Sequence, residues 1–122
     1  MRTSQAIAAA RKLRASTLSE EEYKKLLCDL EGRIQIEIFE RNPENENFIE
    51  FSYEDDNELI IKAPYDEIYV YYLACRTDYY NEEFELYVND KAVFDDLFEK
   101  FKNYYKNSAR MPTSFFKGWW KF

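Results

Sequence analysis

Apolar residues recur at three- and four-residue steps along most of the chain, which is the spacing of one helix face. One such run begins at Ser19, and Ser19 and Glu22 together fit a capping box. Within this run, segment 33–40 (RIQIEIFE) also alternates isoleucine with other residues, as a strand would. The longer spacing favours a helix over this segment, and Asn42-Pro43 ends the element in either case.

A shorter helix is predicted before this run, over Thr3–Arg14, with Thr3 or Ser4 as its cap. An isolated helix of this length is only marginally stable in water. We therefore expect it to pack on its own bundle or on a neighbouring subunit.

Two helices joined by a very short turn are predicted after Pro64. The turn falls at Asn81, and Glu82 and Glu83 open the second helix. The pair should form an antiparallel hairpin that ends at Pro112. The apolar stripes comprise Ile68, Tyr72, Cys75 and Tyr79, widened by Tyr69 and Leu73, in the first helix, and Phe84, Tyr87, Phe94, Phe98, Phe101 and Tyr105 in the second.

The segment 43–64 between these helices has no clear period and is strongly acidic. Two short apolar stretches within it predict either a small β-hairpin or an ordered loop, and long loops in compact domains are usually functional. Its acids, which precede the first cation at Lys62, are Glu44, Glu46, Glu50, Glu54, Asp55, Asp56 and Glu58.

These elements predict a mainly α fold, a small helical bundle with an acidic loop or β-hairpin insertion and an extended C-terminal tail. The chain has 122 residues, of which 46% are hydrophobic, and only two are Gly and three Pro. That length suits one modest core, and the scarcity of helix breakers favours helices. We expect one domain over residues 1–108, followed by a tail over residues 109–122.

Charge is distributed unevenly along the chain. Residues 1–18 carry four cations and no acid, and residues 100–122 carry six cations and no acid. All 24 acids lie between them, so the net charge is −7. This asymmetry bears on partners rather than on fold. The acidic middle argues against a general nucleic-acid-binding protein, which would present a basic face.

The residues of common active sites are missing. There is no histidine, and two glycines cannot build a phosphate-binding loop. Cys28 and Cys75 belong to no CxxC pair and fit small buried hydrophobes. Adjacent carboxylates are expected by chance among 24 acids, and the spacing in Glu54–Glu58 does not match an EF-hand. We expect no enzyme, cofactor or metal, and no membrane partner, because no run approaches about 20 apolar residues.

Tyrosine is unusually frequent, with eleven in the chain and many around the helix that follows Pro64. One face of that helix can enter the core, whereas tyrosines on other faces need water or a second protein at the hydroxyl. A core with solvated edges and a subunit interface both fit this pattern. Candidate interface residues are Arg11, Lys12, Arg14, Tyr69, Tyr71 and Tyr80.

The order of these features resembles a protein family. A Pro-Tyr-Asp-Glu-Ile-Tyr helix start, a tyrosine-rich helix, an Asn turn, a long aromatic helix and a terminal Met-Pro are similar to small head–tail connector, adaptor or head-completion proteins of tailed phages of Gram-positive bacteria. Residues 26–40 (LLCDLEGRIQIEIFE) resemble a helix of the same family. The resemblance covers roughly residues 18–112. This chain departs from the pattern at Glu82, where the family often has Gly, and by continuing beyond Pro112.

The resemblance implies a virion protein of the head–tail neck that assembles, in the host cytoplasm, as a dodecameric ring beneath the portal protein. DNA would pass through the ring without sequence-specific binding, and a stopper or tail-completion protein would dock below. An acidic loop facing the lumen would let DNA slide, because carboxylates repel phosphates. A small acidic inhibitor that imitates DNA is the alternative for a chain with so many carboxylates.

The C-terminal tail combines cations, aromatic residues and a glycine hinge. It can strap its own bundle or dock on another protein, and anchor-type aromatics favour pockets at interface centres. A docking tail would contact the portal or a neighbouring subunit. Its candidate residues are Arg110, Phe115, Phe116, Lys117, Trp119, Trp120, Lys121 and Phe122.

Overall fold

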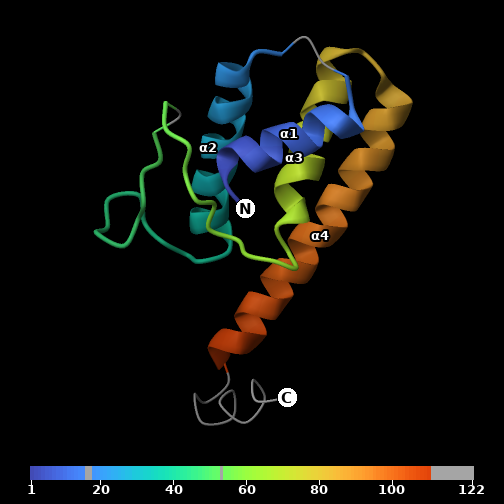
Figure 1. Cartoon of the computed structure of the whole chain (residues 1–122). Coiled ribbons are helices and arrows are strands. Elements are labelled where there is room, and N and C mark those ends of the chain that lie inside the picture. The colour runs from blue at the N-terminus through green and yellow to red at the C-terminus, as the bar shows by residue number, and fades with distance from the viewer. Residues whose placement is uncertain (16–17, 53, 111–122) are drawn as a thin grey trace.

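The computed structural model describes residues 1–15, 18–52 and 54–110, which form four helices (Figure 1). In chain order these are α1 (Thr3–Leu13), α2 (Glu20–Glu37), α3 (Glu67–Tyr80) and α4 (Phe84–Arg110). Within those ranges the backbone forms no strand, and one isolated antiparallel bridge joins Arg2 to Glu58. The prediction of a mainly α bundle is therefore confirmed.

Helix α1 begins at Thr3 as predicted, but its cap is not one of the predicted residues. Its N-cap is Arg2, whose amide donates to the Gln5 side chain at 2.8 Å. The expected caps bind the distant loop instead, because the Ser4 amide and hydroxyl both donate to Asp56 and the Thr3 hydroxyl donates to the Asn57 carbonyl. The loop thus fixes the start of α1.

Helix α2 is capped as predicted, with the Ser19 hydroxyl accepting from the Glu22 amide at 3.2 Å. It continues through the ambiguous segment 33–40 as far as Glu37, with Ile38 as C-cap. Ile34 and Ile38 are buried while Ile36 is 47% exposed. A strand would have placed all three on one face, so this burial pattern is helical.

Helices α3 and α4 run antiparallel, and α3 packs along the first half of the long α4 (Figure 1). The turn contains Asn81, whose amide donates to the Thr77 carbonyl at 2.9 Å. Glu82 follows with φ of 58°, and α4 begins at Phe84. The predicted hairpin and its turn are correct, with α4 starting one or two residues later than expected.

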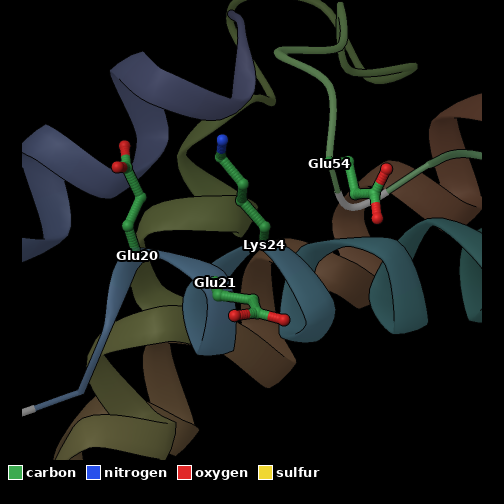
Figure 2. Close-up of a pocket in the computed structure, with 4 residues that line it drawn as sticks. All are labelled: Glu20, Glu21, Lys24 and Glu54. Atoms are coloured by element: carbon green, nitrogen blue, oxygen red, sulfur yellow. The ribbon is translucent and has the colours of Figure 1, made fainter.

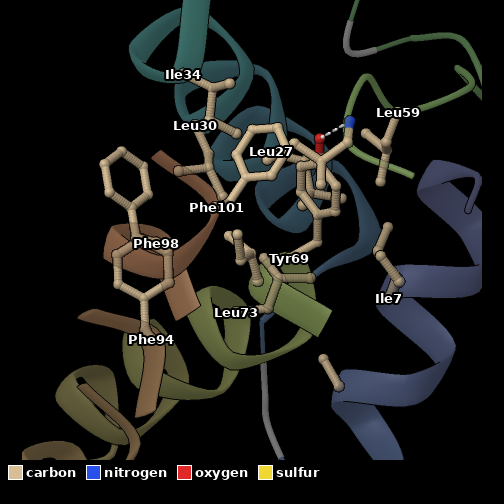
Figure 3. Close-up of a cluster of buried hydrophobic side chains, with 14 of the residues drawn as sticks. Ile7, Leu27, Leu30, Ile34, Leu59, Tyr69, Leu73, Phe94, Phe98 and Phe101 are labelled. Carbon is tan, nitrogen blue, oxygen red and sulfur yellow. Dashed lines mark hydrogen bonds between the residues drawn. The ribbon is translucent and has the colours of Figure 1, made fainter. Parts of the chain in front are cut away.

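The core lies where the four helices meet the end of the loop (Figure 3). Helix α1 covers one side of α3 with two alanines and an isoleucine. The loop contributes Leu59 and Ile61, each 1% exposed. The other large buried side chains include Ile7 of α1, Tyr23, Leu27, Leu30 and Ile34 of α2, Ile68, Tyr69 and Leu73 of α3, and Phe94, Phe98 and Phe101 of α4.

The two predicted stripes are wrong at the turn. Tyr79 and Phe84 belong to the predicted apolar stripes, but they are 51% and 59% exposed. The buried face of α3 at this end is formed by Ala74, Thr77 and Asp78. Because polar side chains occupy the buried positions at this end of α3, the hydrophobic pattern of the sequence assigned the exposed aromatic residues to the apolar face.

The segment between α2 and α3 is an ordered loop in its described residues, not a hairpin. The Gln35 side chain, which is fully buried, binds both the amide and the carbonyl of Ile49 at 2.8 Å. Further along, the Ile60 amide donates to Glu31 at 2.8 Å. The middle of the loop lies beside α2, on the side away from α4, and the last part of the loop crosses to the start of α3 beside α4 (Figure 1).

Candidate interaction surface

An aromatic and apolar surface lies exposed at the α3–α4 turn. We call it the turn patch and define it by Tyr79, Tyr80, Phe84 and Val88, which are 51%, 55%, 59% and 63% exposed. An open hollow of about 500 Å³ is lined by Phe84 and Val88 together with Glu85 and Asn89. The patch extends over the end of α3 and the first turns of α4.

Stacking holds the tyrosines of the turn patch in place. The Arg76 guanidinium lies 5.4 Å from the Tyr79 ring centroid and 5.7 Å from that of Tyr80. The two rings meet edge to face at 6.3 Å, and Tyr79 also contacts the half-buried Tyr87 at 5.8 Å. Rings fixed in this way lose little conformational freedom on binding, which favours tight association.

The border of the turn patch is acidic. Glu82, Glu83 and Glu85 are all exposed beside it. Exposed apolar surface with a polar border is typical of protein interaction sites. The arrangement offers aromatic anchors and negative charge, which are features that a binding partner can use.

A buried charged cluster lies close to the turn and joins three helices. Arg14, just after α1, approaches Asp78 of α3 at 3.2 Å and Asp90 of α4 at 3.0 Å. Asp78 is fully buried and Asp90 is 5% exposed. Burial and the neighbouring Asp90 carboxylate raise the pKa of Asp78 to about 7, although Arg14 opposes the shift. The cluster ties the end of α1 to the hairpin.

Tyr69, predicted at the subunit interface, is instead a core residue with no exposed surface. Its hydroxyl donates to Glu31 at 2.5 Å. The same hydroxyl accepts from the Ile61 amide at 2.9 Å, the bond drawn as a dashed line in Figure 3. Burial raises the pKa of Glu31, and burial together with the Glu31 carboxylate raises the pKa of Tyr69. The prediction for Tyr69 was wrong because this tyrosine satisfies a buried carboxylate.

The other predicted interface residues are divided between several places. Arg11 and Lys12 are exposed on α1. Tyr71 is partly buried against the core. Arg14 belongs to the charged cluster inside the chain, so it is not free for a neighbour. Only Tyr80 belongs to the turn patch.

The acidic loop residues fall into two groups. Asp56 and Glu58 pair with Arg2, and Glu58 also with Lys62. The hydrogen bond from the Ser4 amide, with a smaller effect of Arg2, lowers the pKa of Asp56, and Lys62 lowers the pKa of Glu58. The others are exposed and, among the residues that the structure describes, make no ion pair; they are Glu44, Glu46, Glu50, Glu54 and Asp55. Part of the loop's charge therefore holds the fold, and part faces solvent.

A second hollow, of about 390 Å³, is lined by Glu20, Glu21, Lys24 and Glu54. Figure 2 shows that these side chains point in different directions rather than toward a common centre. No group of three acidic or cysteine side chains in the described ranges could hold a metal ion. We assign no ligand to this hollow.

The predicted docking tail lies almost wholly outside the described residues. This applies to Phe115, Phe116, Lys117, Trp119, Trp120, Lys121 and Phe122, and to the side chain of Arg110. The backbone of α4 continues to Arg110, two residues past the expected end of the domain.

Sequence reasoning missed most of the turn patch. Val88 was not singled out, and Tyr79 and Phe84 were assigned to the apolar stripes of their helices. One signal was available for Val88: at about 100° per residue it lies some 120° around the helix from Phe94, away from the face that Phe94 marks.

Comparison with known proteins identifies no relative: no family model, no curated protein and no solved structure matches the chain. Among the helices described, none is both long enough and apolar enough to cross a membrane.

Proposed function

We propose that this protein is a structural subunit of an oligomeric head–tail connector ring that docks under a phage portal and lets DNA pass to the tail. The observation that carries the proposal is the turn patch, a fixed aromatic surface that the chain does not cover with its described residues. A subunit that works alone gains nothing from such a surface, whereas an assembling one buries it.

The arrangement of charge supports the same role. In a head-to-tail ring each interface joins two different surfaces of the subunit, and opposite charges on those surfaces favour the correct contact. The chain has basic residues toward both ends and acids between them. Exposed loop carboxylates directed at the lumen would repel phosphates and keep the DNA from binding tightly.

Native mass spectrometry of the full chain, alone and with a portal protein, tests this proposal. We expect a ring, either in solution or only on the portal, with a subunit number that matches the symmetry of the complex. A protein that stays monomeric in both samples would contradict it. If that monomer also blocked a DNA-binding enzyme, its exposed acidic loop would favour the alternative, a small inhibitor that imitates DNA.

A further inference from the structure

We infer that the C-terminal tail of one copy of this chain docks on the turn patch of a second copy. Three observations lead to this contact: the apolar character of both surfaces, their opposite charge, and the distance between them along α4. The inference goes beyond the connector role, because head-to-tail association of this kind does not require a portal.

The distance favours a contact between chains. The turn patch includes the first residue of α4 and the tail follows its last, so the 27 residues of this helix separate them by about 40 Å. Trp119 lies nine positions after Arg110 and so reaches about 30 Å even when fully extended. Phe115 and Phe116 therefore fall short of the turn patch on their own chain, and Trp119 and Trp120 could approach its nearer edge, at Val88, only from a fully extended tail that runs straight back along α4.

The two surfaces complement each other chemically. The tail offers two aromatic pairs, Phe115-Phe116 and Trp119-Trp120, together with Lys117 and Lys121 and no acidic side chain. The turn patch offers tyrosine, phenylalanine and valine side chains bordered by Glu82, Glu83 and Glu85. Aromatic anchors in an apolar patch supply most of the affinity, and the charges fix orientation and partner.

Repeating this contact joins copies head to tail. The tail and the turn patch are different surfaces of the chain. When two copies bind, one copy still has an unoccupied turn patch and the other an unoccupied tail, so a further copy can bind at either end. Such an interface closes into a ring when the rotation between copies allows it, and otherwise extends into a filament.

Tryptophan fluorescence can follow the contact directly, because both tryptophans of the chain, Trp119 and Trp120, lie in the tail. As the concentration of the full chain rises, we expect the emission to shift to shorter wavelength and the sedimentation coefficient to increase together. Phe84→Ser/Val88→Ser should weaken this association roughly tenfold or more. Both side chains are more than half exposed, so the substitutions should spare the fold.

A matched control removes apolar surface elsewhere. Ile36→Ser/Ile49→Ser replaces two side chains that are each 47% exposed and lie outside the turn patch. This control should associate like the wild type. Raising the salt concentration should weaken the wild-type contact, because charges at an exposed border are screened.

Mixing two full-length variants tests whether the contact joins different chains. One variant, Phe84→Ser/Val88→Ser, keeps its tryptophans but lacks the patch, and the other, Trp119→Phe/Trp120→Phe, keeps the patch but lacks tryptophan. We expect the emission of the first variant to shift only when the second is added.

Three results would overturn the inference. The first is a shifted emission that does not depend on concentration, which indicates a contact within one chain. The second is association of the Phe84→Ser/Val88→Ser variant that equals association of the wild type. The third is a wild type that remains monomeric at all concentrations. A tail contact that forms without any ring on a portal would instead support this inference and count against the connector role, so the two proposals can fail separately.

Discussion

At the scale of single residues, buried polar side chains decide how the elements meet. Glu31, Gln35 and Asp78 are each at most 1% exposed, and each contacts an element other than its own. Gln35 and Glu31 hold the acidic loop against α2 at Ile49 and at Ile60. Asp78 meets Arg14 and Asp90 near the turn patch. Hydropathy counts such residues as surface, and this is why sequence reasoning misjudged the faces of α3.

Asp78 provides a prediction about pH. Its pKa is raised to about 7 in the folded protein from an ordinary value of 3.8, so the folded state holds a proton that the unfolded chain releases. Stability contributed by this group should therefore be fully present below about pH 4 and fall as the pH rises from about 4 to 7. In Asp78→Asn the free energy of unfolding, measured with urea, should depend less steeply on pH in this window.

The matched control is Asp55→Asn, which removes an exposed carboxylate that makes no ion pair with the described residues. Its pH dependence should equal that of the wild type. Glu31, whose pKa is also raised, contributes a slope to all three proteins, so only their difference reports on Asp78. Parallel profiles for wild type and Asp78→Asn would show that Asp78 titrates normally.

At the scale of elements, helix periodicity predicted the four helices and the short turn between the last two. It placed helix over segment 33–40 because the spacing around that segment extends beyond the alternating isoleucines. It could not predict which residues face outward at the turn, because Thr77 and Asp78 occupy buried positions that apolar side chains usually fill. Nor could it predict that Ser4 and Thr3 bind the loop, since that contact spans more than 50 residues.

The turn itself provides the second prediction. Glu82 has a φ of 58°, in the left-handed region that glycine adopts without strain. Glu82→Gly should relieve that strain and raise the free energy of unfolding by about 0.5–1 kcal/mol, after allowing for the greater freedom of glycine in the unfolded chain. Thermal or urea unfolding measures the change.

The control for this substitution lies three residues further on. Glu85 is exposed in the first turn of α4, where the backbone is helical, and Glu85→Gly removes the same side chain. Glycine in a helix costs up to about 1 kcal/mol, so this variant should be destabilised. If both variants lose stability, the left-handed backbone at Glu82 is not a source of strain.

At the scale of the whole molecule, the sequence predicted which charges the protein carries better than it predicted where those charges lie on the folded surface. The −7 net charge and its basic ends follow directly from the sequence. The structure then shows that several of these charges are used internally, since Arg2, Arg14 and Lys100 each pair with an acid of the same chain. Which charges remain for a partner could be learned only from the packing of distant segments.

The last prediction concerns whether the bundle needs its tail. The C-terminal half of α4 already packs against described residues. The ring centroid of Phe101 lies 6.3 Å from that of Phe39 and 5.5 Å from that of Tyr65, and the Tyr105 and Phe39 centroids are 4.6 Å apart. Because these aromatic contacts already close that end of the core, we expect a chain truncated after Arg110 to keep its helical circular dichroism and its unfolding midpoint. Self-association should be lost at the same time.

The same truncation distinguishes a docking tail from a strap. A strap folded over its own bundle would cover apolar surface, so its removal would lower the free energy of unfolding in proportion to the area exposed, by about 25 cal/mol per Å². The free energy of unfolding of the truncated chain would also depend less steeply on urea concentration than that of the wild type. The reason is that the truncated chain exposes less surface when it unfolds. A truncated chain that unfolds, or melts well below the wild type, would assign the tail to its own bundle and leave the turn patch to some other partner.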